Sequence, residues 1–287
     1  GGSTIGLKIE RGSEIQGDLT LKSGHANTIT DEGDSGVVTV DGNLTATTYA
    51  NNGSITLDQL AVDGTIALNT HGTGNATVVN DAGLQFAGST VGGNLHATAT
   101  TGNITQNSEA LTITGTTTLI TAASDASITL GTTSNAFTGA LIITTNDNDS
   151  GGTDGDVTIH GGTTALIFGD STIDGDLALT STAASTVGIT DSGTLDIRGI
   201  TTISASGVDV TLDSAANNFQ AAVKIQGVNV TIVDAGVIDL GASTVTGTYT
   251  VTAGGAVTDS DTLTITGVTT INASSGNVTL DSAANNF

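Results

Sequence analysis

The chain has 287 residues, with 40 glycines and no proline, cysteine, methionine or tryptophan, and its formal net charge is −23. The absence of cysteine excludes disulfides, thiolate zinc sites and cysteine nucleophiles. Five basic residues against 28 acidic ones cannot neutralise a row of phosphates, so we expect no nucleic-acid binding. Since no apolar run reaches the length of a membrane helix, we also expect no membrane insertion.

Short segments that alternate apolar residues with threonine recur along the whole chain, each after a glycine-containing turn. Examples in chain order are 17–21 (GDLTL), 53–57 (GSITL), 155–159 (GDVTI) and 276–280 (GNVTL). Strict alternation over three to five residues predicts a strand with one buried face. Apolar residues nowhere recur at helical spacing, so we expect only strands and turns.

A longer repeat contains these short ones. Residues 194–219 and 262–287 match at 19 of 26 positions with a constant offset of 68, and 111–137 is a looser copy. Self-similarity at such a period is typical of solenoids. We therefore expect one continuous segment over 1–287, with sub-repeats at 111–193, 194–261 and 262–287.

Three strand series can be followed through the 68-residue unit, and their spacing predicts three turns of roughly 23 residues per unit. The series are Leu195/Ile197, Phe219, Ile238/Leu240 and Leu263/Ile265; Ile203, Val223/Ile225, Val251 and Ile271; and Val210/Leu212, Val230/Ile232, Val257 and Val278/Leu280. Three strands per turn describe a three-sided parallel β-solenoid of 12 or 13 coils. In this register Ile203, Val251 and Ile271 face the axis, whereas Thr202 and Thr270 face solvent.

Several phrases resemble the repetitive shafts of filamentous-haemagglutinin-like adhesins, which are large bacterial surface exoproteins of the two-partner-secretion type. The phrases are 91–95 (VGGNL), 111–118 (LTITGTTT), 239–245 (DLGASTV) and 277–287 (NVTLDSAANNF). The resemblance is clearest from about Val91 to Phe287. It implies a right-handed parallel β-helix on the outer surface of a Gram-negative cell. The family's secretion domain carries an Asn-Pro motif, which a chain without proline does not contain.

One acidic, glycine-rich stretch, 146–156 (NDNDSGGTDGD), is a candidate ion site. Carboxylate oxygens on a flexible turn suit calcium, and the candidate ligands are Asp147, Asp149, Asp154 and Asp156. The spacing matches neither an EF-hand nor tandem calcium-binding nonapeptides. The alternative interpretation is a solvated insertion between coils.

Catalytic chemistry finds little support in the residue pattern. The four histidines, His25, His71, His96 and His160, are scattered singly among Gly, Asn and Thr. Only Arg198 and Lys224 are basic beyond position 22; they are nearly one coil apart and could relieve stacked acidic charge. We expect no enzyme, with a polysaccharide-active β-helix as the alternative.

Ice binding is a second alternative, because flat Thr-x-Thr arrays on a β-helix can order water. Thr112/Thr114, Thr248/Thr250 and Thr264/Thr266 have that form, but their spacing is irregular.

The sequence therefore favours a structural extracellular shaft or spacer of a giant bacterial surface adhesin or fibre. Its expected partners are other copies of itself, lateral or end to end, and cell-surface or matrix components. Because a coil is stabilised by its neighbours, and because Phe287 closes the repeat as Phe219 does, we expect a slice of a longer rod.

Overall fold

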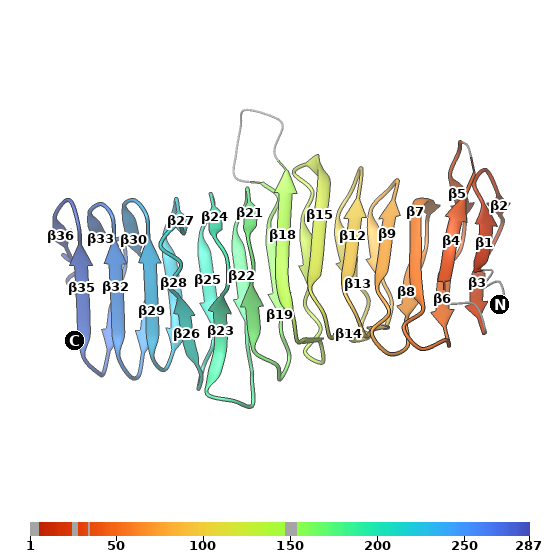
Figure 1. Ribbon diagram of the computed structural model, residues 1–287. Helices are drawn as coiled ribbons and strands as arrows, with labels where there is room; N and C mark the ends of the chain where they lie inside the picture. The colour runs from red at the N-terminus through yellow and green to blue at the C-terminus, as the bar shows by residue number, and fades with distance from the viewer. Residues whose placement is uncertain (1–5, 25–27, 34, 147–153) are drawn as a thin grey trace.

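The computed structural model describes residues 6–24, 28–33, 35–146 and 154–287. The fold is an all-β parallel solenoid of about 12 turns with about 22 residues per turn, which confirms the predicted fold class. Figure 1 shows a straight rod with the two chain ends at opposite ends of it. Within the described residues there is no helix that could cross a membrane.

The strands form two parallel sheets of 18 strands each, called sheet A and sheet B here. Sheet A contains β1 (Leu7–Glu10), β2 (Glu14–Ile15), β4 (Thr28–Glu32), β5 (Val38–Val40), β7 (Ser54–Val62), β9 (Ala76–Asn80), β12 (Leu95–Ala99), β15 (Thr117–Ser124), β18 (Ala140–Asn146), β20 (Leu166–Phe168), β21 (Ser171–Ile173), β23 (Val187–Asp191), β24 (Leu195–Ile197), β26 (Asp209–Leu212), β27 (Asn218–Phe219), β29 (Val230–Asp234), β32 (Tyr249–Ala253) and β35 (Thr269–Ala273). Sheet B contains β3 (Leu19–Ser23), β6 (Leu44–Thr48), β8 (Thr65–Asn69), β10 (Leu84–Phe86), β11 (Ser89–Val91), β13 (Ile104–Gln106), β14 (Leu111–Ile113), β16 (Ile128–Leu130), β17 (Ala136–Phe137), β19 (Val157–His160), β22 (Leu177–Thr180), β25 (Thr201–Ser204), β28 (Val223–Gly227), β30 (Ile238–Leu240), β31 (Ser243–Val245), β33 (Val257–Asp259), β34 (Leu263–Ile265) and β36 (Val278–Thr279).

Most coils contribute three strands: one sheet receives a single strand, and the other receives two strands separated by a bend. From β9 to β18 the single strands β9, β12, β15 and β18 lie in sheet A. From β19 to β28 the roles are exchanged, because the single strands β19, β22, β25 and β28 lie in sheet B. From β29 onward the single strands return to sheet A. We call these stretches, which begin at β9, β19 and β29, blocks.

The exchange occurs because two single strands follow one another at each block boundary. β18 is followed directly by β19, and β28 by β29. At these boundaries one single strand pairs with both strands of the next coil: β18 pairs with β20 and β21, and β28 pairs with β30 and β31. A block therefore advances the rod by three and a half turns. Successive blocks face opposite sides of the rod.

This half turn corrects the three strand series expected from the sequence. Ile203 does stack on Ile225, and Val251 on Ile271, but the first pair lies in sheet B and the second in sheet A. The 68-residue offset relates equivalent positions of two blocks rather than positions stacked on one side. The unit contains an extra single strand, so it closes after three and a half turns and not three.

The alternating pattern produces one continuous core along the axis. Ile203 and Val251 are buried, Ile271 on the last sheet A strand is partly buried, and Thr202 and Thr270 are exposed, as the alternation predicts. Threonine suits the outward positions, since its branched side chain favours extended backbone and its hydroxyl tolerates water. Thr117 and Thr201 are exceptions, because both are buried with unpaired hydroxyls.

Corners are built from glycine and Asn or Asp for a packing reason. A Cβ on Gly139 would lie 2.4 Å from the carbonyl carbon of Gly115 in the preceding coil, so the backbones stack too closely for a side chain. Next to such glycines, Asn75 Oδ1 accepts the N–H of Asn94, and Asn94 Oδ1 accepts the N–H of Thr116. The side chain of one coil thus satisfies the backbone of the next.

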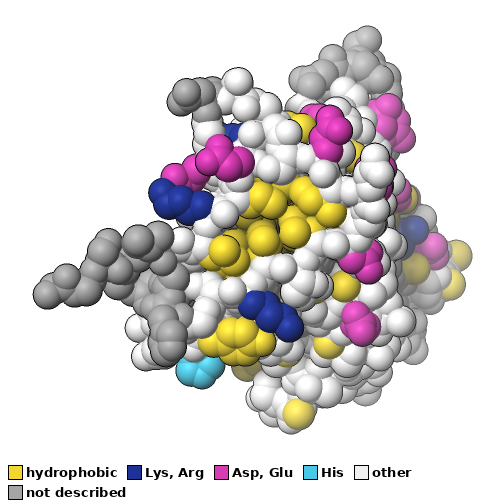
Figure 2. Space-filling view, turned by 90° about the vertical axis from the view of Figure 1, so that its right-hand side faces the viewer, with side chains coloured by type: hydrophobic (Ala, Val, Ile, Leu, Met, Phe, Trp, Pro, Cys, Tyr) yellow, Lys and Arg dark blue, Asp and Glu magenta, His cyan; other side chains and the backbone are white. Residues whose placement is uncertain are grey.

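At the end of the rod that carries β1, β2 and β3, hydrophobic side chains gather in the middle of the end face with charged side chains around them (Figure 2). Leu7, Ile9, Ile15 and Leu19 of these strands are only partly buried against the core. Among the described residues, β1 and β3 each pair with one strand, β4 and β6 respectively.

Replacing Val251 by Asp places an unpaired charge in the core, whereas Thr250→Asp adds the same charge outside. We expect Val251→Asp to lower the free energy of unfolding by at least about 4 kcal/mol. Thr250→Asp should cost about 1 kcal/mol or less. Urea unfolding followed by circular dichroism measures both losses, and equal losses contradict the register.

Candidate functional site

Two of the four candidate calcium ligands, Asp147 and Asp149, lie outside the described residues, whereas Asp154 and Asp156 are exposed. Asp156 Oδ1 accepts the backbone N–H of Asp176 at 2.8 Å, and Asp176 Oδ1 accepts that of Ile200 at 2.7 Å. These carboxylates therefore act as corner acceptors, like the asparagines described above. The described part of the chain contains no group of three or more His, Asp or Glu side chains arranged to hold a metal ion.

A cavity of about 300 Å³ lies beside this corner, where β18, β21 and β24 stack. Its lining residues are Thr145, Asn146, Thr172, Ile173, Asp174, Asp196 and Arg198. The side chain of Asp174 is only 7% exposed and pairs with the guanidinium of Arg198. The backbone N–H of Asp174 donates to Thr145 Oγ1 at 2.9 Å. The buried carboxylate is thus neutralised by a cation from the next coil.

The second carboxylate of this cavity, Asp196, is also used between coils. Asp196 Oδ1 accepts hydrogen bonds from Asn218 Nδ2 and Gln220 Nε2, both at 2.9 Å. A general acid and base pair needs carboxyl groups directed at a shared reacting atom. Here each carboxylate is directed at the neighbouring coil, and the cluster ties β18, β21, β24 and β27 together.

The remaining sequence candidates are spread over separate elements. His71 lies in an exposed turn, His96 is on β12, and His160 on β19 accepts the N–H of Gly162 through Nδ1 at 3.0 Å. His25 lies outside the described residues. Arg198 and Lys224 do not stack, because the register places Lys224 beside Thr202.

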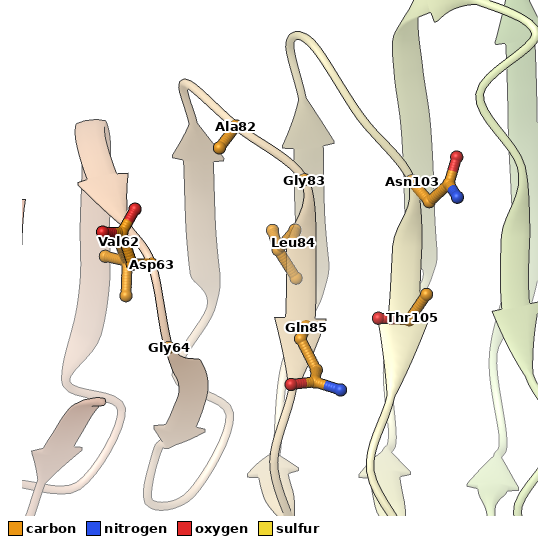
Figure 3. Close-up of a pocket in the computed structure, with 9 residues that line it drawn as sticks. All are labelled: Val62, Asp63, Gly64, Ala82, Gly83, Leu84, Gln85, Asn103 and Thr105. Carbon is orange, nitrogen blue, oxygen red and sulfur yellow. The ribbon is translucent and has the colours of Figure 1, made fainter. Parts of the chain in front are cut away.

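A corner depression of about 370 Å³ is shown in Figure 3. It is lined by Val62, Asp63, Gly64, Ala82, Gly83, Leu84, Gln85, Asn103 and Thr105 from successive coils. Asp63 is the one titratable side chain among them. The depression follows from glycine turns that bring no bulk to the corner.

The proposed ice-binding pairs do not share a face. Thr112 on β14 and Thr264 on β34 belong to sheet B, whereas Thr250 on β32 belongs to sheet A. Thr114, Thr248 and Thr266 lie outside the strands.

Sequence reasoning missed the role of the repeated phrase DSAANNF, which docks onto a carboxylate of the preceding coil. Asp259 accepts the N–H groups of Asp281 at 2.9 Å and Ser282 at 3.3 Å, and Asn285 Nδ2 at 2.6 Å. The equivalent Asp191 makes the same three contacts in the previous block, with Asp213, Ser214 and Asn217. The signal was the phrase itself together with an aspartate 22 residues before it.

The phrase also places an asparagine carboxamide between coils. Asn217 is buried and its Oδ1 accepts the N–H of Leu195 at 2.9 Å, while Asn135 does the same for Leu111. Burial alone would raise the pKa of Asp259, but the hydrogen bonds from Asn285, Asp281 and Ser282 outweigh it, so the pKa is lowered. The ionised carboxylate is therefore the form that holds the next coil.

The model of one protein family, described as repeats of unknown function (DUF5649), matches residues 73–144, 154–226 and 227–287. Each matched segment coincides with one block of strands: β9 to β18, β19 to β28 and β29 to β36. No curated protein and no solved structure matches the chain. The unit that the family describes is thus the three-and-a-half-turn block.

Asp259→Asn should weaken the packing of the last coil. The substitution replaces one carboxylate oxygen, which accepts hydrogen bonds, by an amide NH2 group that faces other N–H donors. We expect a loss of about 1–2 kcal/mol at neutral pH, seen as faster hydrogen exchange at the amides of Asp281 and Ser282. Since the folded pKa is lowered, the contribution of Asp259 is present above its unfolded pKa of about 3.9 and is lost as the pH falls through the folded value.

The matched control is Asp261→Asn, because that exposed carboxylate accepts, among the described residues, only the adjacent N–H of Thr262. Asp261→Asn should leave the exchange unchanged. An Asp259→Asn difference that persists unchanged at acidic pH contradicts the assignment.

Proposed function

This chain belongs to the DUF5649 family of repeats, and we propose that it is the shaft of an extracellular bacterial surface adhesin or fibre, a spacer that holds other parts of its protein away from the cell. The observation that carries the proposal is the single hydrophobic core that runs from β3 to β34. A rod with one continuous core transmits position along its length, since each coil packs on the next. The stacked coils provide a long rod, which is what a spacer requires.

The resemblance of the repeat phrases to filamentous-haemagglutinin-like shafts supports an outer-surface location. The carboxylates of the Asp174–Asp196 cluster support no particular reaction, since Asp196 Oδ1 accepts two amides and Asp174 Oδ1 pairs with Arg198, each from a neighbouring coil. Other copies of the chain and cell-surface or matrix components are the proposed partners. Calcium binding at the Asn146–Asp156 stretch stays a proposal. Of its four candidate ligands, Asp154 and Asp156 lie among the described residues.

Excision of residues 194–261 tests the spacer function in the full-length protein on its cell. The new junction joins Gly193 to Thr262 and restores the sequence Gly-Thr-Leu that surrounds the native Thr194. The rod should refold and shorten by three and a half coils, roughly 17 Å at 4.8 Å per coil. Adhesion should persist, with the shortening measured by electron microscopy.

A smaller excision, 194–204, removes β24 and β25 without removing a whole repeat unit. The strands after the junction then lose their register with the preceding coil, and folding beyond the junction should be disrupted. Loss of adhesion after the in-register excision, with folding intact, contradicts the spacer function. Thermal hysteresis or depolymerisation of a polysaccharide by the purified protein also contradicts it, in favour of ice binding or catalysis.

A further inference from the structure

The outward side of the single strands lacks acidic side chains. In the block from β9 to β18 the outward residues are Thr77, Val79, His96, Thr98, Thr118, Ile120, Ile142 and Thr144. In the block from β19 to β28 they are Thr158, His160, Ala178, Thr180, Thr202, Ser204, Lys224 and Gln226. Neither set contains one of the chain's 28 acidic residues.

The single strands at the two ends of the chain follow the same rule. Outward residues on β29, β32 and β35 are Thr231, Val233, Thr250, Thr252, Thr270 and Asn272. Those on β3, β6 and β8 are Thr20, Lys22, Thr45, Thr47, Thr65, Ala67 and Asn69. We call the outward side of all these single strands the single-strand faces. Each is free of carboxylates in a chain of net charge −23.

Carboxylates lie instead on the two-strand sides and at the corners. Asp196 on β24 and Asp239 on β30 point outward from two-strand sides. Asp18 and Asp156 occupy corners and Asp209 begins β26, and each accepts a backbone N–H of the next coil. Among the described residues, acidic side chains thus lie on the two-strand sides, at the corners that form the rims of the single-strand faces, or, like Asp31 and Asp234, in the interior.

Two of the five cationic side chains lie on the single-strand faces. Lys8, Arg11 and Arg198 pair with carboxylates of their own chain. Within the described residues, Lys22 and Lys224 have no carboxylate partner, and both lie on single-strand faces of sheet B. A long lysine side chain on such a face can reach a carboxylate on the rim of a molecule packed against it.

We propose that the single-strand faces are lateral docking surfaces for a second copy of this chain, packed side by side. Acid-free faces let two highly acidic rods approach while their rim carboxylates stay apart, and Lys22 and Lys224 then meet the rim of the partner. Because successive blocks turn by half a revolution, every rod carries such faces on both sides. Each copy therefore binds two neighbours, and association continues into ribbons.

The area of one face sets the strength of this contact. Four strands 4.8 Å apart, each of about five residues, cover roughly 300 Å². A stable complex buries about 800 Å² per partner, so one block does not hold a pair together. Two faces on the same side act together, so association should be weak for this chain and should tighten with the number of blocks.

The dependence of association on salt distinguishes a second copy of this chain on the single-strand faces from a polyanion bound through the lysines. Two rods of like charge repel over about 8 Å at physiological ionic strength, and salt screens that repulsion. Pairing of copies should therefore strengthen with NaCl, whereas binding of a polyanion weakens. The proposal requires the shape of the rod but not the shaft function, so it and the excision experiment can fail separately.

The experiment is sedimentation velocity over a concentration series up to millimolar protein, at low and high NaCl. Thr202→Glu places a carboxylate on the sheet B face of one block, and Thr118→Glu does so on the sheet A face of another. Thr105→Glu, outward on the two-strand side at β13, is the control with the same added charge. The wild type and Thr105→Glu should associate beyond dimers, and more strongly in high salt.

Each face variant should weaken association at least about tenfold and leave pairs as the largest species, because one side remains. The double variant should stay monomeric. A wild type that stays monomeric, association that all four variants share, or association that NaCl weakens overturns the proposal. Association shared by all four variants assigns the contact to the rod ends instead.

Discussion

The stacking of each coil on the next is the interaction on which everything else in this molecule depends. The described strands of one coil hydrogen-bond to strands of adjacent coils, and the core consists of side chains placed above one another along the axis. This single constraint explains the composition. Proline would remove a ladder donor, bulky corner residues would collide with the preceding coil, and unpaired corner N–H groups would be costly. Glycine with Asn or Asp at the corners answers both requirements, as Gly139 on Gly115 and Asn94 on Asn75 show.

The same constraint makes the half turn between blocks possible. A side of the coil can hold either one strand or two strands with a bend, provided that the next coil continues the hydrogen bonds. β28 does so by pairing with β30 and β31 at once. The family repeat therefore need not contain a whole number of turns. Its consequence is that equivalent surfaces of successive blocks face opposite sides of the rod.

Much of this architecture could be predicted from the sequence, because alternation with period two reports directly which side chains face the axis. Ile203 and Val251 inward and Thr202 outward follow from that rule. The half turn could not be predicted, since a 68-residue offset reveals equivalence and not stacking. The docking of Asn217 and Asn285 onto Asp191 and Asp259 was equally hidden, because these contacts span 26 residues and only the folded coil brings them together. For the candidate calcium site, the structure adds that Asp156 serves the corner of the next coil.

The half turn can be measured directly, because the chain has no cysteine and accepts spin labels at introduced ones. Thr211 and Thr270 lie in one column of sheet A, three coils apart through Thr231 and Thr250, at roughly 14 Å. Thr202 and Thr270 are equivalent positions of two blocks, 68 residues apart, on opposite sheets. Dipolar EPR should show strong broadening for labels at 211 and 270 and little for labels at 202 and 270. The reverse result, close labels at 202 and 270 and distant ones at 211 and 270, contradicts the three-and-a-half-turn block.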